Sequence, residues 1–206
     1  MADGSDQRKR GRKFDQVRDG AREVFLSAGF EGANVDDIAR VAGVSKATIY
    51  SYFPDKRLMF MEVVRFECQR QSDSAIAAID MAAPVRDLLL YAARTMLAFM
   101  TSDFGQRIFR ICVAESERFP ELAQNFYDSG PAVVRNRLTE FFAEATARGD
   151  LVIDDLDLAA DQFHALCKAD IFDRMVFAQS QTFTPAEMTR VAEGAVATFL
   201  ARYGAR

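Results

Sequence analysis

Residues 35–54 read VDDIARVAGVSKATIYSYFP and contain two short helical patterns joined by a turn. In the first pattern, residues 35–42, apolar residues recur three or four positions apart, as on the buried face of a helix. Gly43 can adopt the positive φ that ends a helix, and Ser45 can cap a second helix over residues 46–53. Pro54 ends this second helix because the residue before a proline disfavours the α conformation. Two short helices joined by a glycine-containing turn indicate a helix-turn-helix.

The residues that precede this pair predict a longer helix over residues 14–28. Gly29 stands where a left-handed cap would end it, and Asn34 can cap the helix that starts at residue 35. The predicted buried face of the long helix consists of Phe14, Val17, Ala21, Val24, Phe25 and Ala28. The three helical patterns together predict an N-terminal unit of three helices.

The second short helix has the chemistry to bind DNA. A hydroxyl, an ammonium group, a methyl group and a phenol can contact base edges, thymine methyls and phosphates in a major groove. The exposed positions expected to supply these groups are Lys46, Ala47, Thr48, Ser51 and Tyr52. A plain helical corner uses the same caps and glycine, so the pattern alone leaves that structural alternative open.

Charge is distributed unevenly along the chain. Residues 1–60 carry a net charge of +2 and the remaining residues carry −6, within a total of −4. Five of the six residues in 8–13 are basic, and such a run attracts polyanions. A solvated tail that maintains solubility is the alternative interpretation of this run.

A longer motif makes the DNA-binding interpretation specific. Residues 25–30, FLSAGF, and residues 35–56, VDDIARVAGVSKATIYSYFPDK, resemble the DNA-binding domain of the TetR family of bacterial repressors. The resemblance covers roughly residues 14–65. It implies an N-terminal arm and helix-turn-helix domain over residues 1–56 that binds double-stranded operator DNA. It also implies that DNA is contacted by Asn34, Lys46, Ala47, Thr48, Tyr50, Ser51, Tyr52 and Lys56, with Asn34 and Lys56 at phosphates. Ser51 is smaller than the residue that many members carry there, so the base it reads is undetermined.

Beyond residue 56 every segment has a helical pattern, so the chain is predicted to be all-α with a second helical domain over residues 57–206. Thr184 and Glu187 have the spacing of a capping box, with Pro185 at the first helical position. The expected helices cover residues 58–79, 84–100, 104–116, 120–147 with a break at Gly130 and Pro131, 155–179, and 185–203.

The last two helices bear on assembly. The helix expected over residues 155–179 has apolar residues around much of its circumference, so it must be covered on two sides. The family resemblance implies that the last two helices pack against those of a second copy. A C2 homodimer would present two recognition helices to a pseudo-palindromic site. A monomer core is the alternative.

The middle helices, between the helix-turn-helix and the last two helices, are expected to enclose a cavity for a small, largely apolar effector. Methionine and aromatic side chains suit pockets that adapt to several ligands, although such a stripe is more often ordinary core. The candidate lining residues are Met96, Phe99, Met100, Phe104, Phe109, Phe126, Tyr127, Phe163, His164 and Cys167. Residues 114–122, AESERFPEL, resemble a regulatory-domain stretch of TetR-like proteins, of the AefR-like type.

Other functional classes find little support. The sequence has one histidine and three widely spaced cysteines, so a metal site lacks ligands and no cofactor is expected. It lacks the nucleophile and phosphate-loop motifs of common enzymes, so no catalytic residue is predicted. No apolar run is long enough to cross a bilayer, and a cytoplasmic location is expected. The sequence therefore predicts a ligand-released homodimeric repressor. The alternative is a DNA-binding regulator without small-molecule response, whose C-terminal domain only dimerises or docks another protein.

Overall fold

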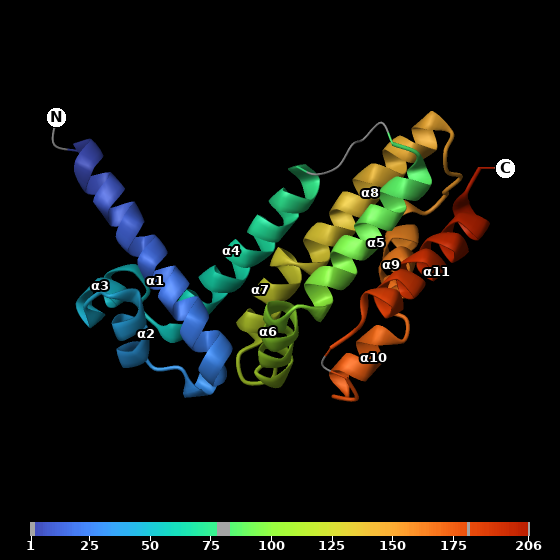
Figure 1. Cartoon of the computed structure of the whole chain (residues 1–206). Coiled ribbons are helices and arrows are strands. Elements are labelled where there is room, and N and C mark those ends of the chain that lie inside the picture. Colours follow the sequence, from blue (N-terminus) through green and yellow to red (C-terminus); the bar gives the residue numbers. More distant parts are fainter. Residues whose placement is uncertain (1–2, 78–82, 181, 206) are drawn as a thin grey trace. The chain divides into compact units, whose positions relative to one another are not determined.

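The computed structural model describes residues 3–77, 83–180 and 182–205, and all extended regular elements in these ranges are helices (Figure 1). The all-α prediction is confirmed. None of these helices combines the length and hydropathy that crossing a membrane would require. The elements are α1 (Asp3–Gly32), α2 (Val35–Ala42), α3 (Lys46–Tyr52), α4 (Lys56–Ala77), α5 (Val85–Thr101), α6 (Asp103–Ala114), α7 (Pro120–Ser129), α8 (Pro131–Arg148), α9 (Leu156–Cys167), α10 (Ile171–Val176) and α11 (Pro185–Tyr203).

Packing divides the chain into two compact units. The first comprises the residues up to Gln69 together with Arg107–Ser129, and the second comprises Arg70–Gln106 together with the residues from Gly130 onward. The first unit therefore combines α1, α2 and α3 with most of α4, most of α6, and α7. The expected domains 1–56 and 57–206 concern function rather than packing, and they stay a prediction.

The first unit is built on a close crossing of α1 and α2. A Cβ atom added to Gly20 of α1 would lie 2.8 Å from the Cβ of Ala42 on α2, so only glycine fits there. Fully buried side chains of four helices fill the interior beside this crossing, namely Phe25, Ile38, Ile49 and Phe60. The short helices are thereby fixed against the long one.

The core of the second unit is an aromatic cluster. The ring centroid of Phe142 lies 4.9 Å from that of Phe199 and 6.1 Å from that of Phe163, and all three side chains are almost completely buried. These rings come from α8, α9 and α11, and residues of α5 pack around them. The apolar face of α11 is thus covered by its own chain.

The prediction of one helix over residues 155–179 is wrong, because α9 ends at Cys167 and α10 starts at Ile171. Asp170 has φ 66° and ψ −53°, which interrupts the helix. Its carboxylate accepts hydrogen bonds from Arg174 at 3.4 Å and Arg190 at 2.6 Å, which helps hold the break. Neither a glycine nor a proline marks this position in the sequence.

The first helix also differs from its prediction. It begins at Asp3 and includes the basic run, although Gly29 does interrupt it, with φ 74° and ψ 179°. Ala28, expected on the buried face, is exposed. The bounds of α2 and the capping box of α11 are confirmed, and α3 ends at Tyr52, one residue before its predicted end. Residues 78–79 of the helix expected over 58–79 lie outside the described residues.

Candidate nucleic-acid interface

The start and end of α2 are fixed by the residues that the sequence indicated. The Asn34 side-chain oxygen accepts a hydrogen bond from the backbone N–H of Asp37 at 2.8 Å, which satisfies an unpaired helix donor. Gly43 ends the helix with φ 65°, and the next N–H, of Val44, donates to the Ala39 carbonyl at 3.0 Å. These bonds define the turn that leads into α3.

Helix α3 is short and capped at both ends. The Ser45 hydroxyl accepts from the Thr48 N–H at 3.2 Å, and the Phe53 N–H donates to the Ile49 carbonyl at 2.9 Å. Ile49 is completely buried, so its side of the helix faces the core. The opposite side is exposed and carries Lys46, Ala47, Tyr50 and Ser51. This is the geometry of a helix that presents one face outward.

An aromatic contact also ties α3 to α1. The Tyr52 ring lies edge-to-face on the Phe14 ring, with centroids 5.5 Å apart. Phe14 in turn lies 5.2 Å from Phe53, which closes α3. Tyr52 is only partly exposed, as is Thr48, whereas Tyr50 exposes 52% of its surface. Of the two tyrosines, Tyr50 offers the more accessible phenol.

Several of the side chains expected to contact DNA already bind charged neighbours. The ammonium of Lys46 lies 2.5 Å from the carboxylate of Asp36, and this hydrogen bond raises the pKa of Lys46. Asp37 accepts from Arg40 at 3.2 Å and from the side-chain amide of Asn34 at 2.7 Å, and these bonds lower the pKa of Asp37. Lys46 and Asn34 are exposed but engaged with α2.

Lys56 is bonded to the end of α1 and the segment between α1 and α2. Its ammonium donates to the backbone carbonyls of Glu31 at 3.3 Å and Ala33 at 3.2 Å, and it sits 4.6 Å from the ring centroid of Phe30. These carbonyls lie where α1 ends and the chain turns into α2. Lys56 thus holds this corner together, and its phosphate contact stays a prediction.

The structure adds basic groups that the site prediction did not contain. Arg40 on α2 is exposed, with 73% of its side-chain surface accessible, and it pairs along its own helix with Asp37. Arg12 and Lys13 are exposed on α1. Side chains of the remaining basic-run members, Arg8, Lys9 and Arg10, lie outside the described residues. The spacing of Asp37 and Arg40 could have revealed the exposed face of α2.

The ten candidate effector contacts belong to both packing units. Phe109, Phe126 and Tyr127 lie in the first, and Met96, Phe99, Met100, Phe104, Phe163, His164 and Cys167 lie in the second. Phe163 and Cys167 are buried in the core cluster, and Met96 and Met100 pack against it. Burial lowers the pKa of His164 to about 4, so its imidazole is neutral at pH 7. A shared cavity stays a prediction.

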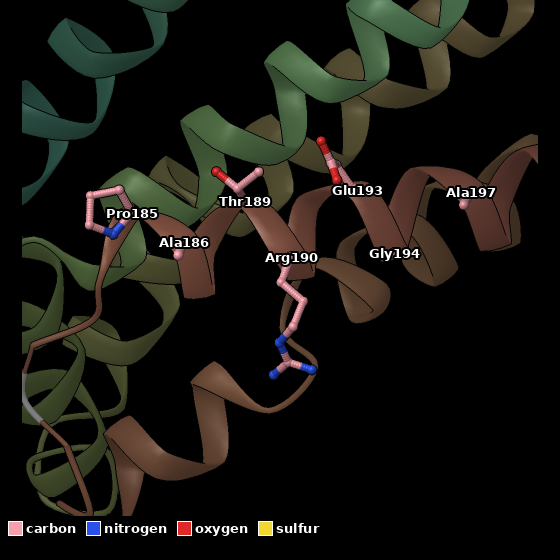
Figure 2. Close-up of a pocket in the computed structure, with 7 residues that line it drawn as sticks. All are labelled: Pro185, Ala186, Thr189, Arg190, Glu193, Gly194 and Ala197. Atoms are coloured by element: carbon pink, nitrogen blue, oxygen red, sulfur yellow. The ribbon is translucent and has the colours of Figure 1, made fainter.

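A shallow hollow runs along the exposed side of α11 (Figure 2). Its lining repeats every three or four residues and is mostly small, comprising Pro185, Ala186, Thr189, Arg190, Glu193, Gly194 and Ala197. Arg190 and Glu193 lie on neighbouring turns and extend toward opposite sides of α11 (Figure 2). A Cβ atom added to Gly194 would meet nothing within 4 Å, so the packing of its own chain does not require a glycine there.

Two family descriptions match this chain. Residues 17–63 match "Bacterial regulatory proteins, tetR family", and residues 87–205 match "AefR-like transcriptional repressor, C-terminal domain". The second match alone spans more than half of the chain.

Solved structures resemble nearly the whole molecule. A TetR-family transcriptional regulator from Mesorhizobium loti has a TM-score of 0.88 at 28% identity, over 95% of this chain and 98% of that one. The flavonoid-responsive regulator FrrA has a TM-score of 0.77 at 35% identity, over 95% of this chain and 99% of that one.

Curated sequences match over shorter stretches. The transcriptional repressor AcnR of Corynebacterium diphtheriae is 29% identical over 79 residues, which is 38% of this chain and 41% of that protein. The chain spans half or less of the length of the first curated relatives it matches.

Proposed function

Because this chain belongs to the TetR family of bacterial transcriptional regulators, we propose that it is a homodimeric repressor released from a pseudo-palindromic operator by a small, largely apolar effector. The observation that carries the proposal is α3. This helix buries Ile49, is capped at both ends and exposes its other face. A short capped helix of this kind can enter a major groove about 12 Å wide.

Each exposed group on α3 has a distinct role in this proposal. The Tyr50 phenol and the Ser51 hydroxyl contact base edges, the Ala47 methyl packs on thymine methyls, and Lys46 contacts phosphate. Thr48 and Tyr52, which are partly exposed, contact DNA at the edge of the exposed face of α3. Asn34 and Arg40 approach the backbone from α2. Arg12 and Lys13 add contacts that do not depend on sequence.

Selection from random DNA duplexes at near-physiological salt tests DNA recognition. We expect a palindromic motif, and binding to it should weaken strongly in Tyr50→Ala. Phe177→Ala is the control because Phe177 is another exposed aromatic ring, with 72% of its surface accessible, and it belongs to neither the candidate DNA contacts nor the candidate effector contacts. Retention without any motif, varying only with salt, would contradict a specific repressor. Equal operator affinity of both variants would remove Tyr50 from the interface.

The second copy is proposed to pack on the exposed side of α11. Small residues let two helices approach closely, and Gly194 lies in the middle of this side without any intrachain reason for a glycine. Leu158 on α9, the helix that packs against α11, is also exposed. In Gly194→Leu a larger side chain would separate the two copies, so sedimentation velocity should show monomers. Ala143→Leu on the exposed side of α8 is the control and should stay dimeric. A dimeric Gly194→Leu variant would exclude this surface.

The effector is proposed to bind among helices of the AefR-like region and to favour a conformation that fits the operator poorly. A ligand can shift that equilibrium only by its difference in affinity for the two conformations. Because the relative FrrA is described as flavonoid-responsive and is 35% identical to this chain, an aromatic effector is the first class to test. Quercetin should raise the operator Kd and the thermal midpoint together.

One observation favours a second candidate function, a regulator that does not respond to small molecules. Phe163 and Cys167, two expected effector contacts, belong to the packed core of the second unit. If the whole region is core, it only dimerises or docks another protein. Operator affinity that stays constant across a chemically diverse library of apolar compounds, without thermal stabilisation, would favour this alternative.

A further inference from the structure

The stretch AESERFPEL, residues 114–122, forms an ordered turn between α6 and α7. The Phe119 N–H donates to the Glu115 carbonyl at 2.7 Å, and the Leu122 N–H donates to the Phe119 carbonyl at 2.9 Å. Leu122 is buried and anchors the start of α7. The side chains of Arg118 and Phe119 therefore project from a hydrogen-bonded backbone rather than from a free loop.

This turn contacts the DNA-binding helices at three points. Arg118 forms an ion pair with Glu31, and Arg57 forms one with Glu121 at 3.0 Å. Between these pairs, the Phe119 ring packs edge-to-face on Phe30, with centroids 5.7 Å apart. The contacts reach the end of α1 and the start of α4. All of them lie inside the first packing unit.

The contacted corner is the one that sets the beginning of α2. Lys56 sits over the Phe30 ring and donates to the carbonyls of Glu31 and Ala33. The residue after Ala33 is Asn34, whose side chain caps α2. A displacement of Glu31 or Phe30 would therefore be passed to Lys56 and to the start of α2 through direct contacts.

The sequence position of the turn gives this contact its meaning. Residues 107–129 fall within the 87–205 match to the AefR-like regulatory region, yet they pack with the N-terminal helices. We propose that Arg118 and Glu121 are positioning residues for operator binding, which hold the corner formed by Glu31, Lys56 and Asn34 in its DNA-binding arrangement. This inference rests on the proposed function and specifies how the regulatory region reaches the DNA-binding helices.

Charge reversal at the Arg118–Glu31 pair separates positioning from simple attraction to DNA. Glu31→Arg adds positive charge, which by attraction alone would strengthen DNA binding. If the pair positions the corner, Glu31→Arg should instead weaken operator binding about three- to tenfold, within the range by which single substitutions change the coupling between sites. Arg118→Glu should weaken it at least as much. The double variant restores the pair and the net charge, so it should bind within about twofold of the original protein.

The matched control is the Arg137–Glu140 pair on α8, whose ends are 3.1 Å apart and similarly exposed. The same three charge reversals there should leave operator affinity nearly unchanged. Circular dichroism should show that all six variants are folded. Tighter operator binding by Glu31→Arg, or failure of the double variant to recover, would overturn the inference.

Hydrogen exchange without DNA keeps the test independent of the proposed function. Glu31→Arg should accelerate exchange in peptides covering residues 30–42, and the double variant should return it to the original rate. Unchanged exchange would overturn the positioning role even if an operator is found. Faster exchange in a protein that selects no operator would show instead that the contact exists and the proposed function has failed.

Discussion

The close crossing of α1 and α2 at Gly20 gives a prediction that depends on one methyl group. In Gly20→Ala the new Cβ would lie 2.8 Å from both the Cβ and the backbone nitrogen of Ala42, whereas ordinary contact begins near 3.4 Å. Helices α1 and α2 must then separate by about 0.6 Å, because the obstructing atoms include backbone. Overpacking of this kind destabilises by about 1–3 kcal/mol.

The same substitution elsewhere in α1 provides the comparison. Gly11 is exposed, and a Cβ there meets nothing within 4 Å, so Gly11→Ala should stabilise the helix by up to about 1 kcal/mol. If the two variants differ by about 2 kcal/mol and the urea m-value is about 2 kcal/mol/M, their midpoints differ by about 1 M. Urea titrations followed by circular dichroism at 222 nm measure this difference. Equal midpoints for Gly11→Ala and Gly20→Ala would refute the close crossing.

Three other predictions address titration and charge. Burial raises the pKa of all three thiols, to about 11 for Cys68 and about 12 for Cys112 and Cys167, so the folded protein at pH 8 should resist Ellman's reagent and urea should expose three reactive thiols. His164 has a folded pKa of about 4, below its usual value of 6.5, so the unfolded chain binds more protons than the folded chain between pH 4 and 6.5. The free energy of unfolding should therefore fall as the pH drops from 6.5 to 4. Urea titrations should show a weaker pH dependence for His164→Gln. Asp36→Asn should strengthen binding to all DNA sequences by up to about fivefold, the value of an exposed ion pair, because Lys46 then contacts phosphate without giving up Asp36, whereas Glu144→Gln on α8 should leave the affinity unchanged.

Local sequence signals were sufficient for the helix-turn-helix. Asn34, Gly43 and Ser45 act within three or four residues of where they stand, so their caps follow from sequence alone. The break at Asp170 has no such local cause. The carboxylate there is bound by Arg190, 20 residues further along the chain, and the apolar pattern continues across the break. A long-range ion pair of this kind leaves no periodic signal.

For a related reason, sequence alone could not separate core residues from cavity residues among the candidate effector contacts. Phe163 is an aromatic residue of the type expected to line a pocket, but it is buried by Phe142 and Phe199, which lie on other helices. Spacing in the sequence gives the face of a helix, not what covers that face. The contact of Arg118 with Glu31 spans 87 residues and was equally invisible.

The basic side chains proposed to contact DNA already bind other groups of the protein in this structure. Lys46 pairs with Asp36, Arg40 pairs with Asp37, and Lys56 binds carbonyl groups. Binding a phosphate exchanges one charged partner for another, so each exchange changes the free energy only slightly while releasing counterions. The exposed Tyr50 ring and Ala47 methyl have no ion pair to give up before they contact a base. Discrimination between DNA sequences should therefore come mainly from the uncharged face of α3, and the cations should set its register on the duplex and its dependence on salt.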